Sequence, residues 1–273
     1  MHVGCNTKQI ICIRWGRKYG PEYVNRLYGM VARNVTPPFR FYCVTDSTEG
    51  LRSEIDVIPL PELDCEMPRT RQGIWGKSRL WRPDLGGLSG SVLFMDLDVV
   101  VTGSLDPFFT HGRPEDVILT RNANTPFERL GQTSLFRFPV GGLAALREEF
   151  LADPQKVAET YVFEQRFVTK CTPSGVTFWP PGWVATFRWH CVRTFPVNYI
   201  LPPKLPPNAR TVIFPGGLNP ADAVDGRRFG DVPIRGPWAH LKAGLRGERR
   251  GSLARHMRGY LLPTPWVRDA WRE

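Results

Sequence analysis

The sequence predicts an α/β protein with a doubly wound, mostly parallel sheet that is flanked by helices. In the first sixty residues, strand-like apolar runs alternate with an amphipathic helix, as is typical of parallel sheets. A longer apolar run over 91–101 predicts a strand buried on both faces. Polar residues follow several predicted strands, at the sheet edge where such folds bind ligands.

The first hundred residues are expected to supply most of the parallel sheet. A helix that begins at Pro21 has apolar residues at offsets 0, 3, 4 and 7 from Val24, and Pro37 marks its end. A second, short helix is expected to end before Pro83. The predicted strands are 10–15, 39–45, 55–60 and the run 91–101, and the short helix is 74–81.

The second half of the chain is expected to complete the sheet and to add loops. Further strands are predicted at 116–120, 133–138 and 211–214, and helices at 142–151 and 154–169. Residues 173–220 are rich in Pro and aromatic side chains. This segment predicts irregular loops over the end of the sheet, on the side where an acceptor would bind.

Charge divides the chain into an expected domain, 1–240, and a basic, aromatic tail, 241–273. The protein has a net charge of +10, and the tail contributes eight Lys or Arg against three acids, or +5. Tyr260, Trp266 and Trp271 are interleaved with these charges. The tail predicts either contact with an anionic membrane surface or a helix packed on its own domain with its charges in water. Nucleic-acid binding is not expected, because no signature of a known nucleic-acid-binding module is present.

Composition indicates an ordinary globular protein of the cytoplasm, with or without peripheral attachment to the inner membrane face. Of its 273 residues, 42% are hydrophobic and 23% charged, and no stretch approaches the ~20 apolar residues of a membrane span. The N-terminus lacks the apolar core of a signal peptide. The six cysteines form no Cys-x-x-Cys pair, so reduced thiols are expected.

Asp96 and Asp98 end the most apolar part of the run 91–101 and form an Asp-x-Asp motif. Two carboxylates this close repel each other and need a counter-charge, and side chains at i and i+2 of an extended segment point the same way. One Mg²⁺ or Mn²⁺ ion can therefore bind both. The alternative is that both acids only cap a strand and face water.

Two enzyme classes place Asp-x-Asp after a buried strand. In metal-dependent glycosyltransferases the acids hold the metal of a nucleotide-sugar diphosphate, and in haloacid-dehalogenase phosphatases the first Asp is the nucleophile. The phosphatase strand usually opens the chain and is followed by Gly-Thr, whereas about ninety residues precede Asp96 here. This space suits a nucleotide-binding half and favours the glycosyltransferase.

Seven ordered segments give the chain a resemblance to bacterial glycosyltransferases of the GT-A fold, related to glycosyltransferase family 8. The segments are 15–19, 43–46, 75–80, 94–98, 133–138, 164–167 and 214–220. The resemblance implies that Asp96 and Asp98 bind Mn²⁺ or Mg²⁺ and the donor diphosphate. It also implies that Arg14, Trp15 and Tyr19 receive the base of a UDP-linked donor. The alternative for Trp15 is a core residue at a strand end.

The same resemblance assigns roles to three further residues. Lys77 would contact the sugar phosphate, Glu164 the sugar hydroxyls, and the Gln165 amide would lie under the anomeric carbon. A neutral amide is a weak nucleophile, but its carbonyl dipole can stabilise an oxocarbenium-like centre. The alternatives are a solvated Lys77, and Glu164 and Gln165 as exposed positions on a helix.

The late segment 214–220 departs from the family pattern. Pro215 stands where the family has a metal-binding His, and Asn219 stands where it has a diphosphate-binding Lys. The resemblance implies donor contacts at Gly216 and at Asn219, whose side chain can still donate a hydrogen bond. Pro offers neither a ligand nor an N–H. The sequence thus predicts a metal-dependent enzyme that moves a hexose from a nucleotide-sugar to a glycan or lipid-linked acceptor. The resemblance implies that the nucleotide is UDP. A catalytically weakened protein that only binds sugar nucleotides, and a phosphatase, remain the alternatives.

Overall fold

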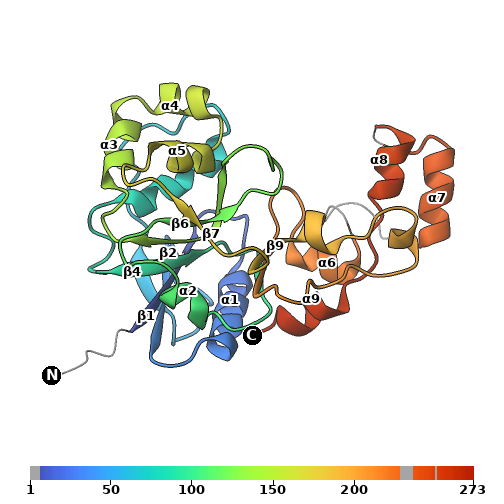
Figure 1. Cartoon of the computed structure of the whole chain (residues 1–273), viewed down its shortest axis with the longest axis horizontal. Coiled ribbons are helices and arrows are strands. Elements are labelled where there is room, and N and C mark those ends of the chain that lie inside the picture. The colour runs from blue at the N-terminus through green and yellow to red at the C-terminus, as the bar shows by residue number, and fades with distance from the viewer. Residues whose placement is uncertain (1–6, 228–235, 250) are drawn as a thin grey trace. The chain divides into compact units, whose positions relative to one another are not determined.

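The computed structural model describes residues 7–227, 236–249 and 251–273, and the chain forms two compact units (Figure 1). The first unit comprises Met1–Leu97 and Ser104–Pro180, and the second comprises Asp98–Gly103 and Pro181–Glu273. The chain therefore leaves the first unit briefly after residue 97, returns at 104, and leaves it finally after 180.

The first unit is built on a seven-stranded sheet in the order β3-β2-β1-β4-β7-β6-β8. Strand β1 pairs in parallel with β2 and β4, β2 pairs in parallel with β3, and β7 runs antiparallel to β4 and β6. The strands are β1 (Lys8–Arg14), β2 (Phe39–Thr45), β3 (Asp56–Pro59), β4 (Ser91–Met95), β6 (Ile118–Arg121), β7 (Gly131–Pro139) and β8 (Thr177–Phe178). The predicted mixed α/β class with a mostly parallel sheet is confirmed.

Helices cover both faces of this sheet, as the doubly wound pattern requires (Figure 1). Alternate residues of β1 supply the two faces: Ile11 and Ile13 pack into the core cluster that contains Trp75 and Phe150, whereas Ile10 is buried on the opposite face. The helices of this unit are α1 (Pro21–Asn34), α2 (Asp106–Thr110), the 3₁₀ helix η1 (Gln72–Trp81), α3 (Ala144–Ala152), α4 (Pro154–Tyr161) and α5 (Glu164–Cys171).

Helix α1 forms as its sequence pattern predicts. Pro21 occupies the first turn, where a missing N–H costs no hydrogen bond, and Val24 and Leu27 are fully buried. The Tyr28 ring meets Phe41 of β2 edge-on, with 5.6 Å between centroids. This apolar stripe fixes α1 against the sheet.

Two predicted elements are each divided in the structure. The run 91–101 forms two strands in different sheets, because Asp96–Asp98 is a turn between β4 and β5 (Val99–Val101). The predicted helix 154–169 breaks at Val162, whose φ is +62°, so that α5 begins at Glu164. The break lets Phe167 pack against Trp81 at 5.6 Å. Tertiary packing thus overrides helix continuity at a β-branched residue.

In the second unit, the described residues form a three-stranded sheet in the order β5-β10-β9 and the helices α6 to α9. Strand β10 is antiparallel to β5 and parallel to β9. Besides β5, its elements are β9 (Val184–Thr186), the π-helical turn η2 (Phe187–Cys191), the 3₁₀ turn η3 (Val197–Tyr199), β10 (Thr211–Ile213), α6 (Pro220–Asp225), α7 (Pro237–Leu245), α8 (Leu253–Arg258) and α9 (Pro265–Ala270). Much of 173–220 is irregular, as expected.

The C-terminal residues pack within the second unit. Tyr260, Leu261 and Trp271 are buried, and Trp266 donates a hydrogen bond from Nε1 to the Pro203 carbonyl at 3.0 Å. Of the two alternatives for the tail, the burial of Tyr260 and Trp271 favours packing within the chain's own second unit. The predicted boundary after residue 240 falls inside α7. Within the described part of the chain, no helix has both the length and the apolar character needed to cross a bilayer.

Candidate functional site

Polar side chains collect in the first unit where β1, β2 and β4 reach their carboxyl ends. Arg14 ends β1, Asp46 follows β2 and Asp96 follows β4. The Gly16 amide donates to the Asp46 carboxylate at 3.2 Å, and the Asp96 amide donates to the Ser134 carbonyl at 2.8 Å. Because β7 runs antiparallel to β4, its first residues lie at this same edge. Arg14, Asp46 and Asp96 therefore lie at the same carboxyl-terminal edge of the sheet.

Lys77 of η1 supplies the counter-charge that Asp96 needs. Its Nζ lies 2.7 Å from one carboxylate oxygen of Asp96 and 2.9 Å from the other. The same ammonium donates to the Thr133 carbonyl at 3.2 Å and lies 5.1 Å from the centroid of the Phe94 ring. Both charged side chains are mostly buried, with exposed fractions of 17% for Lys77 and 20% for Asp96. Salt and solvent therefore weaken the attraction between Lys77 and Asp96 less than they weaken a surface ion pair.

Glu164 is brought to the same place by the break before α5. It is buried, and its Oε2 accepts a hydrogen bond from the Thr133 hydroxyl at 2.7 Å. Its Oε1 has no hydrogen-bond partner among the residues that the structure describes. Burial raises the pKa of Glu164, and nearby Asp96 raises it further, while Lys77 and the Thr133 hydrogen bond act in the opposite direction.

Thr133 therefore links Glu164 to the ion pair of Lys77 and Asp96. Its carbonyl accepts from Lys77 and its hydroxyl donates to Glu164. We call Lys77, Asp96, Thr133 and Glu164 the Lys77 network. Gln165 follows Glu164 in the first turn of α5, where its side chain is half-buried.

Trp15 packs beside the Lys77 network and is neither fully buried nor free. Its indole is half-buried against the core, and a Cβ on Gly76 would lie only 2.6 Å from the Trp15 Cζ2 atom. Glycine at position 76 thus allows the indole to lie against η1, one residue before Lys77. The two expectations for Trp15, core residue and ligand contact, are compatible with this half-exposed position.

Arg14 and Tyr19 also lie near the end of β1. Arg14 is 9% exposed and donates to the Ser47 carbonyl at 3.4 Å, and its Nε has no partner within the described chain. The Tyr19 ring lies 4.7 Å from that of Tyr23, with the Lys18 ammonium 4.6 Å above it. The base-binding roles of Arg14, Trp15 and Tyr19 stay predictions.

The remaining predicted site residues belong to the second unit. Asp98 is half-buried and directly precedes β5. Gly216 is exposed with a φ of +101°, a conformation that glycine adopts without strain. Pro215 is half-buried at the same turn.

Asn219 has a structural role that the sequence analysis did not identify. Its side-chain oxygen accepts from the Asp222 amide at 3.0 Å, and the Asp222 carboxylate accepts from the Asn219 amide at 3.3 Å. The two residues form a capping box at the start of α6. The spacing of Asn219, Pro220 and Asp222 was the sequence signal for this cap.

The donor atoms suit a hard divalent cation, but the set is small. No group of three or more His, Cys, Asp or Glu side chains that could hold a metal ion occurs among the residues described. Asp96 and Asp98 offer two carboxylates, and Mg²⁺ commonly binds through one or two carboxylates together with substrate phosphates and water. Both Asp96 oxygens already contact Lys77, so a cation at Asp96 would share or displace that ammonium.

Sequence reasoning identified Lys77, Asp96 and Glu164 but missed the residue that connects them. Thr133 and Ser134 are two adjacent polar residues that open the predicted strand 133–138, and this position was the available signal. Phe94 lies under the Lys77 ammonium, and its sequence context indicated only an ordinary core residue.

Comparison with known proteins supports the fold. No family model matches the chain, and no curated protein matches its sequence. The solved structures similar to it include the galactosyltransferase LgtC in complex with donor and acceptor sugar analogs, the bifunctional glycosyltransferase WbbM without ligands, and apo GlyE of Streptococcus pneumoniae TIGR4.

These likenesses are structural, at low sequence identity. For LgtC the TM-score is 0.55 at 14% identity, with 78% of this chain and 88% of LgtC covered. For WbbM the TM-score is 0.55 at 14% identity, covering 80% of this chain and 47% of WbbM. For GlyE the TM-score is 0.53 at 14% identity, covering 78% of this chain and 56% of GlyE. The chain thus has the α/β fold of GT-A glycosyltransferases, and spans about half the length of WbbM and GlyE.

Proposed function

We propose that the protein is a metal-dependent glycosyltransferase that moves a hexose from a UDP-linked donor to a glycan or lipid-linked acceptor, in the manner of glycosyltransferase family 8. The observation that carries the proposal is the Lys77 network at the ligand-binding edge of a GT-A sheet. A lysine, a half-buried carboxylate and a buried carboxyl group are joined there through Thr133. Such buried ionic groups are costly to stability, which favours a functional reason for them.

The donor would bind across the carboxyl ends of β1 and β4. Trp15 offers a half-exposed indole for the flat base, and Arg14 and Tyr19 flank it. Lys77 would contact the sugar phosphate, because its ammonium is already held at this edge. Gly216 and Asn219 would contact the diphosphate, and the Asn219 amide nitrogen can donate while its oxygen caps α6.

Asp96 and Asp98 would hold Mn²⁺ or Mg²⁺. When bound, such an ion neutralises charge on the departing diphosphate. The Lys77 ammonium lies close enough to Asp96 to exchange that carboxylate for a phosphate oxygen as the donor enters. Asp96 would then be paired with Lys77 in the free protein and with the metal ion in the donor complex.

Glu164 and Gln165 would act on the sugar itself. The unpartnered Oε1 of Glu164 can accept a hydrogen bond from a sugar hydroxyl, which would satisfy a buried atom that otherwise has no partner. Gln165 would direct its carbonyl dipole toward the anomeric carbon as positive charge develops there.

The second unit would serve the acceptor and, with a lipid-linked acceptor, an anionic membrane surface. It has 15 Lys or Arg against 7 Asp or Glu, a net +8, and the first unit accounts for the other +2. Trp238 and Leu245 of α7 are 74% and 65% exposed, so apolar side chains accompany this charge. The protein would then act in the cytoplasm at the inner membrane face.

A thermal-shift screen tests donor binding. UDP-sugars should stabilise the protein in the presence of Mn²⁺, by ~2.7 kcal/mol at 100 times the dissociation constant. Asp98→Ala should abolish the metal-dependent part of the shift, whereas Asp269→Ala, at an exposed position of the same unit, should keep it. Equal donor affinity in Asp98→Ala and the parent would refute the metal assignment.

Transfer is tested by UDP release. Lys77→Met should lower the initial rate at least tenfold, while Lys156→Met, at an exposed site of the first unit, should leave it unchanged. Donor binding without release in the parent protein would instead identify a catalytically weakened, sugar-nucleotide-binding protein. Pro215 at the expected His position favours that second candidate, because proline cannot bind the metal. The phosphatase alternative finds no support in a GT-A fold.

A further inference from the structure

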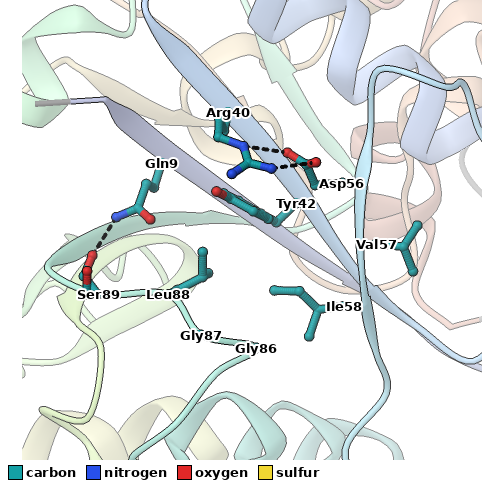
Figure 2. Close-up of a pocket in the computed structure, with 10 residues that line it drawn as sticks. All are labelled: Gln9, Arg40, Tyr42, Asp56, Val57, Ile58, Gly86, Gly87, Leu88 and Ser89. Atoms are coloured by element: carbon teal, nitrogen blue, oxygen red, sulfur yellow. Dashed lines mark hydrogen bonds and ion pairs between the residues drawn. The ribbon is translucent and has the colours of Figure 1, made fainter. Parts of the chain in front are cut away.

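A second pocket lies in the first unit, at the edge of the sheet opposite the Lys77 network. It has a volume of about 390 Å³, and residues near the beginnings of β1, β2 and β3 line it. Gln9 near the start of β1 is five residues from Arg14 at its end, so the two edges are about 17 Å apart along the strand. A sugar ring in the candidate active site cannot reach this pocket. Figure 2 shows the pocket and its side chains.

The pocket is formed by one face of three parallel strands and the turn before β4. Gln9 pairs with Arg40, and Tyr42 pairs with Asp56, so these side chains point to the same face of the sheet. The opposite wall is the Gly86–Ser89 turn. A Cβ on Gly86 would lie 2.8 Å from Ile58, so glycine is needed there for the turn to approach the sheet.

The pocket is close to neutral, although it contains two charged side chains. Arg40 donates to both carboxylate oxygens of Asp56, at 2.9 and 2.8 Å, as the dashed lines in Figure 2 mark. This bidentate pair cancels its own charge and fixes both groups in one plane. A phosphate or a cation would have to compete with an existing ion pair, so the pocket suits an uncharged ligand.

Polar atoms without partners remain on the same wall. Gln9 donates from Nε2 to the Ser89 carbonyl at 2.7 Å, which fixes its amide, but no acceptor bond to its Oε1 occurs within the described residues. Tyr42 is 93% buried, and its hydroxyl likewise has no hydrogen bond to any described residue, although Tyr42 lines the pocket. A hydroxyl that lines a pocket and has no partner in the protein is available to donate to and accept from a ligand. The Tyr42 hydroxyl can donate and accept a hydrogen bond, and Gln9 Oε1 can accept one. Together they match the hydroxyl groups of a polyol.

Apolar surface completes the lining. Ile58, Leu88 and the Tyr42 ring present carbon atoms beside these polar groups. A pyranose has the same division, with hydroxyl groups at its rim and C–H groups on its faces, and pockets of ~300–1,000 Å³ are typical of small-ligand sites. We propose that this pocket is a second, non-catalytic carbohydrate site that binds an uncharged sugar ring. Its use in holding a glycan acceptor rests on the proposed function, whereas the binding itself does not.

Binding is tested on the full chain with a defined panel of probes. The panel contains the methyl glycosides of glucose, galactose, mannose, rhamnose and N-acetylglucosamine, with inorganic phosphate as the charged comparison. Saturation-transfer NMR should detect at least one glycoside, and phosphate should not displace it. If no glycoside binds, or if phosphate competes with it, the proposal is overturned.

Two variants locate the binding. Tyr42→Phe removes one oxygen atom and keeps the ring, and Gln9→Ala removes the free acceptor. Each should weaken glycoside binding by about threefold to tenfold. Tyr28→Phe is the matched control, because Tyr28 also has an arginine 5.1 Å from its ring centroid but packs on the other face of the sheet. If neither Tyr42→Phe nor Gln9→Ala changes the affinity for the glycoside, the pocket is rejected as its binding site.

The same samples separate this inference from the proposed function. UDP binding should be equal in the parent, Tyr42→Phe and Gln9→Ala, since these residues lie far from the Lys77 network. Glycoside binding without any UDP binding would reject the proposed function and support the second site. UDP binding without glycoside binding would do the reverse.

Discussion

Glu164→Gln is the substitution that most directly tests the Lys77 network. Glutamine has nearly the same shape as glutamate, and its carbonyl can still accept from the Thr133 hydroxyl, which lies 2.7 Å from Glu164 Oε2. What the substitution removes is the ionisation of a buried carboxyl group whose second oxygen has no partner in the described structure. Stability and activity should therefore change in opposite directions.

The sign of the stability change follows from the raised pKa of Glu164. Its ordinary value is 4.5, and burial raises it in the folded protein. Between these two values the folded protein retains a proton that the unfolded chain releases. The contribution of the neutral Glu164 carboxyl group to the free energy of unfolding is thus fully present below about pH 4.5. This contribution is lost as the pH rises through the folded pKa. Within this window the free energy of unfolding falls by up to about 1.4 kcal/mol per pH unit.

Glu164→Gln does not ionise, so it should escape this loss. The difference in unfolding free energy between the variant and the parent should shift in favour of the variant as the pH rises above 4.5 and through the raised folded pKa of Glu164. Donor turnover should fall at least tenfold in the same variant, because the amide group changes the contact with the sugar. Urea unfolding in EDTA, which keeps metal ions out of the comparison, measures the first effect.

The control is Glu148→Gln, at an exposed position of α3. Its unfolding free energy should follow that of the parent at every pH. A difference in unfolding free energy between Glu164→Gln and the parent that does not change as the pH rises above 4.5 would refute the burial argument. Full turnover in Glu164→Gln would remove Glu164 from the candidate site.

Three further predictions concern other parts of the chain. Val162→Gly should raise the free energy of unfolding by about 1 kcal/mol in urea, because glycine adopts the φ of +62° without the strain of a β-branched residue; no gain would argue against the break between α4 and α5. Asn219→Ala should cost about 1 kcal/mol through loss of the α6 cap, and Asn219→Asp should restore it; equal stabilities would reject the cap. Arg246→Glu with Arg255→Glu should weaken sedimentation with anionic vesicles at least fivefold, since each cation near the surface contributes about 1 kcal/mol, while Arg17→Glu in the first unit should not; binding that ignores both changes would exclude a membrane role for α7 and α8.

Much of the parallel sheet was predictable because its signals are local. The strand 39–45 was predicted with the same bounds that β2 has, and α1 follows its apolar spacing from Pro21. The division of 91–101 was not predictable, because Val99–Val101 is as apolar as the strand before it while pairing with β10, more than a hundred residues later. The break at Val162 had no local signal either, since a valine is an unusual residue at positive φ.

The site was predicted as residues but not as a network. Lys77 and Asp96 were assigned to the donor phosphates, and their direct ion pair and the role of Thr133 depend on strand pairing that one sequence does not show. The two alternatives for the tail could not be separated for a related reason. Composition places Tyr260 and Trp271 among basic residues, but only packing decides that they are buried.

The three valines of β5 carry a consequence for biosynthesis. Their hydrogen-bonding partner β10 begins at Thr211, 110 residues after Val101, so at ~5–20 residues per second the ribosome exposes β5 for roughly 5–20 seconds before β10 exists. During that interval a short, uncharged Val-Val-Val segment is a nascent strand with both edges unsatisfied. Such segments attract other chains and chaperones. From the synthesis of Val101 until residues 211–213 emerge, the nascent protein therefore carries a strand without its partner, and a ribosome stalled in that interval would hold a chain whose second sheet is still incomplete.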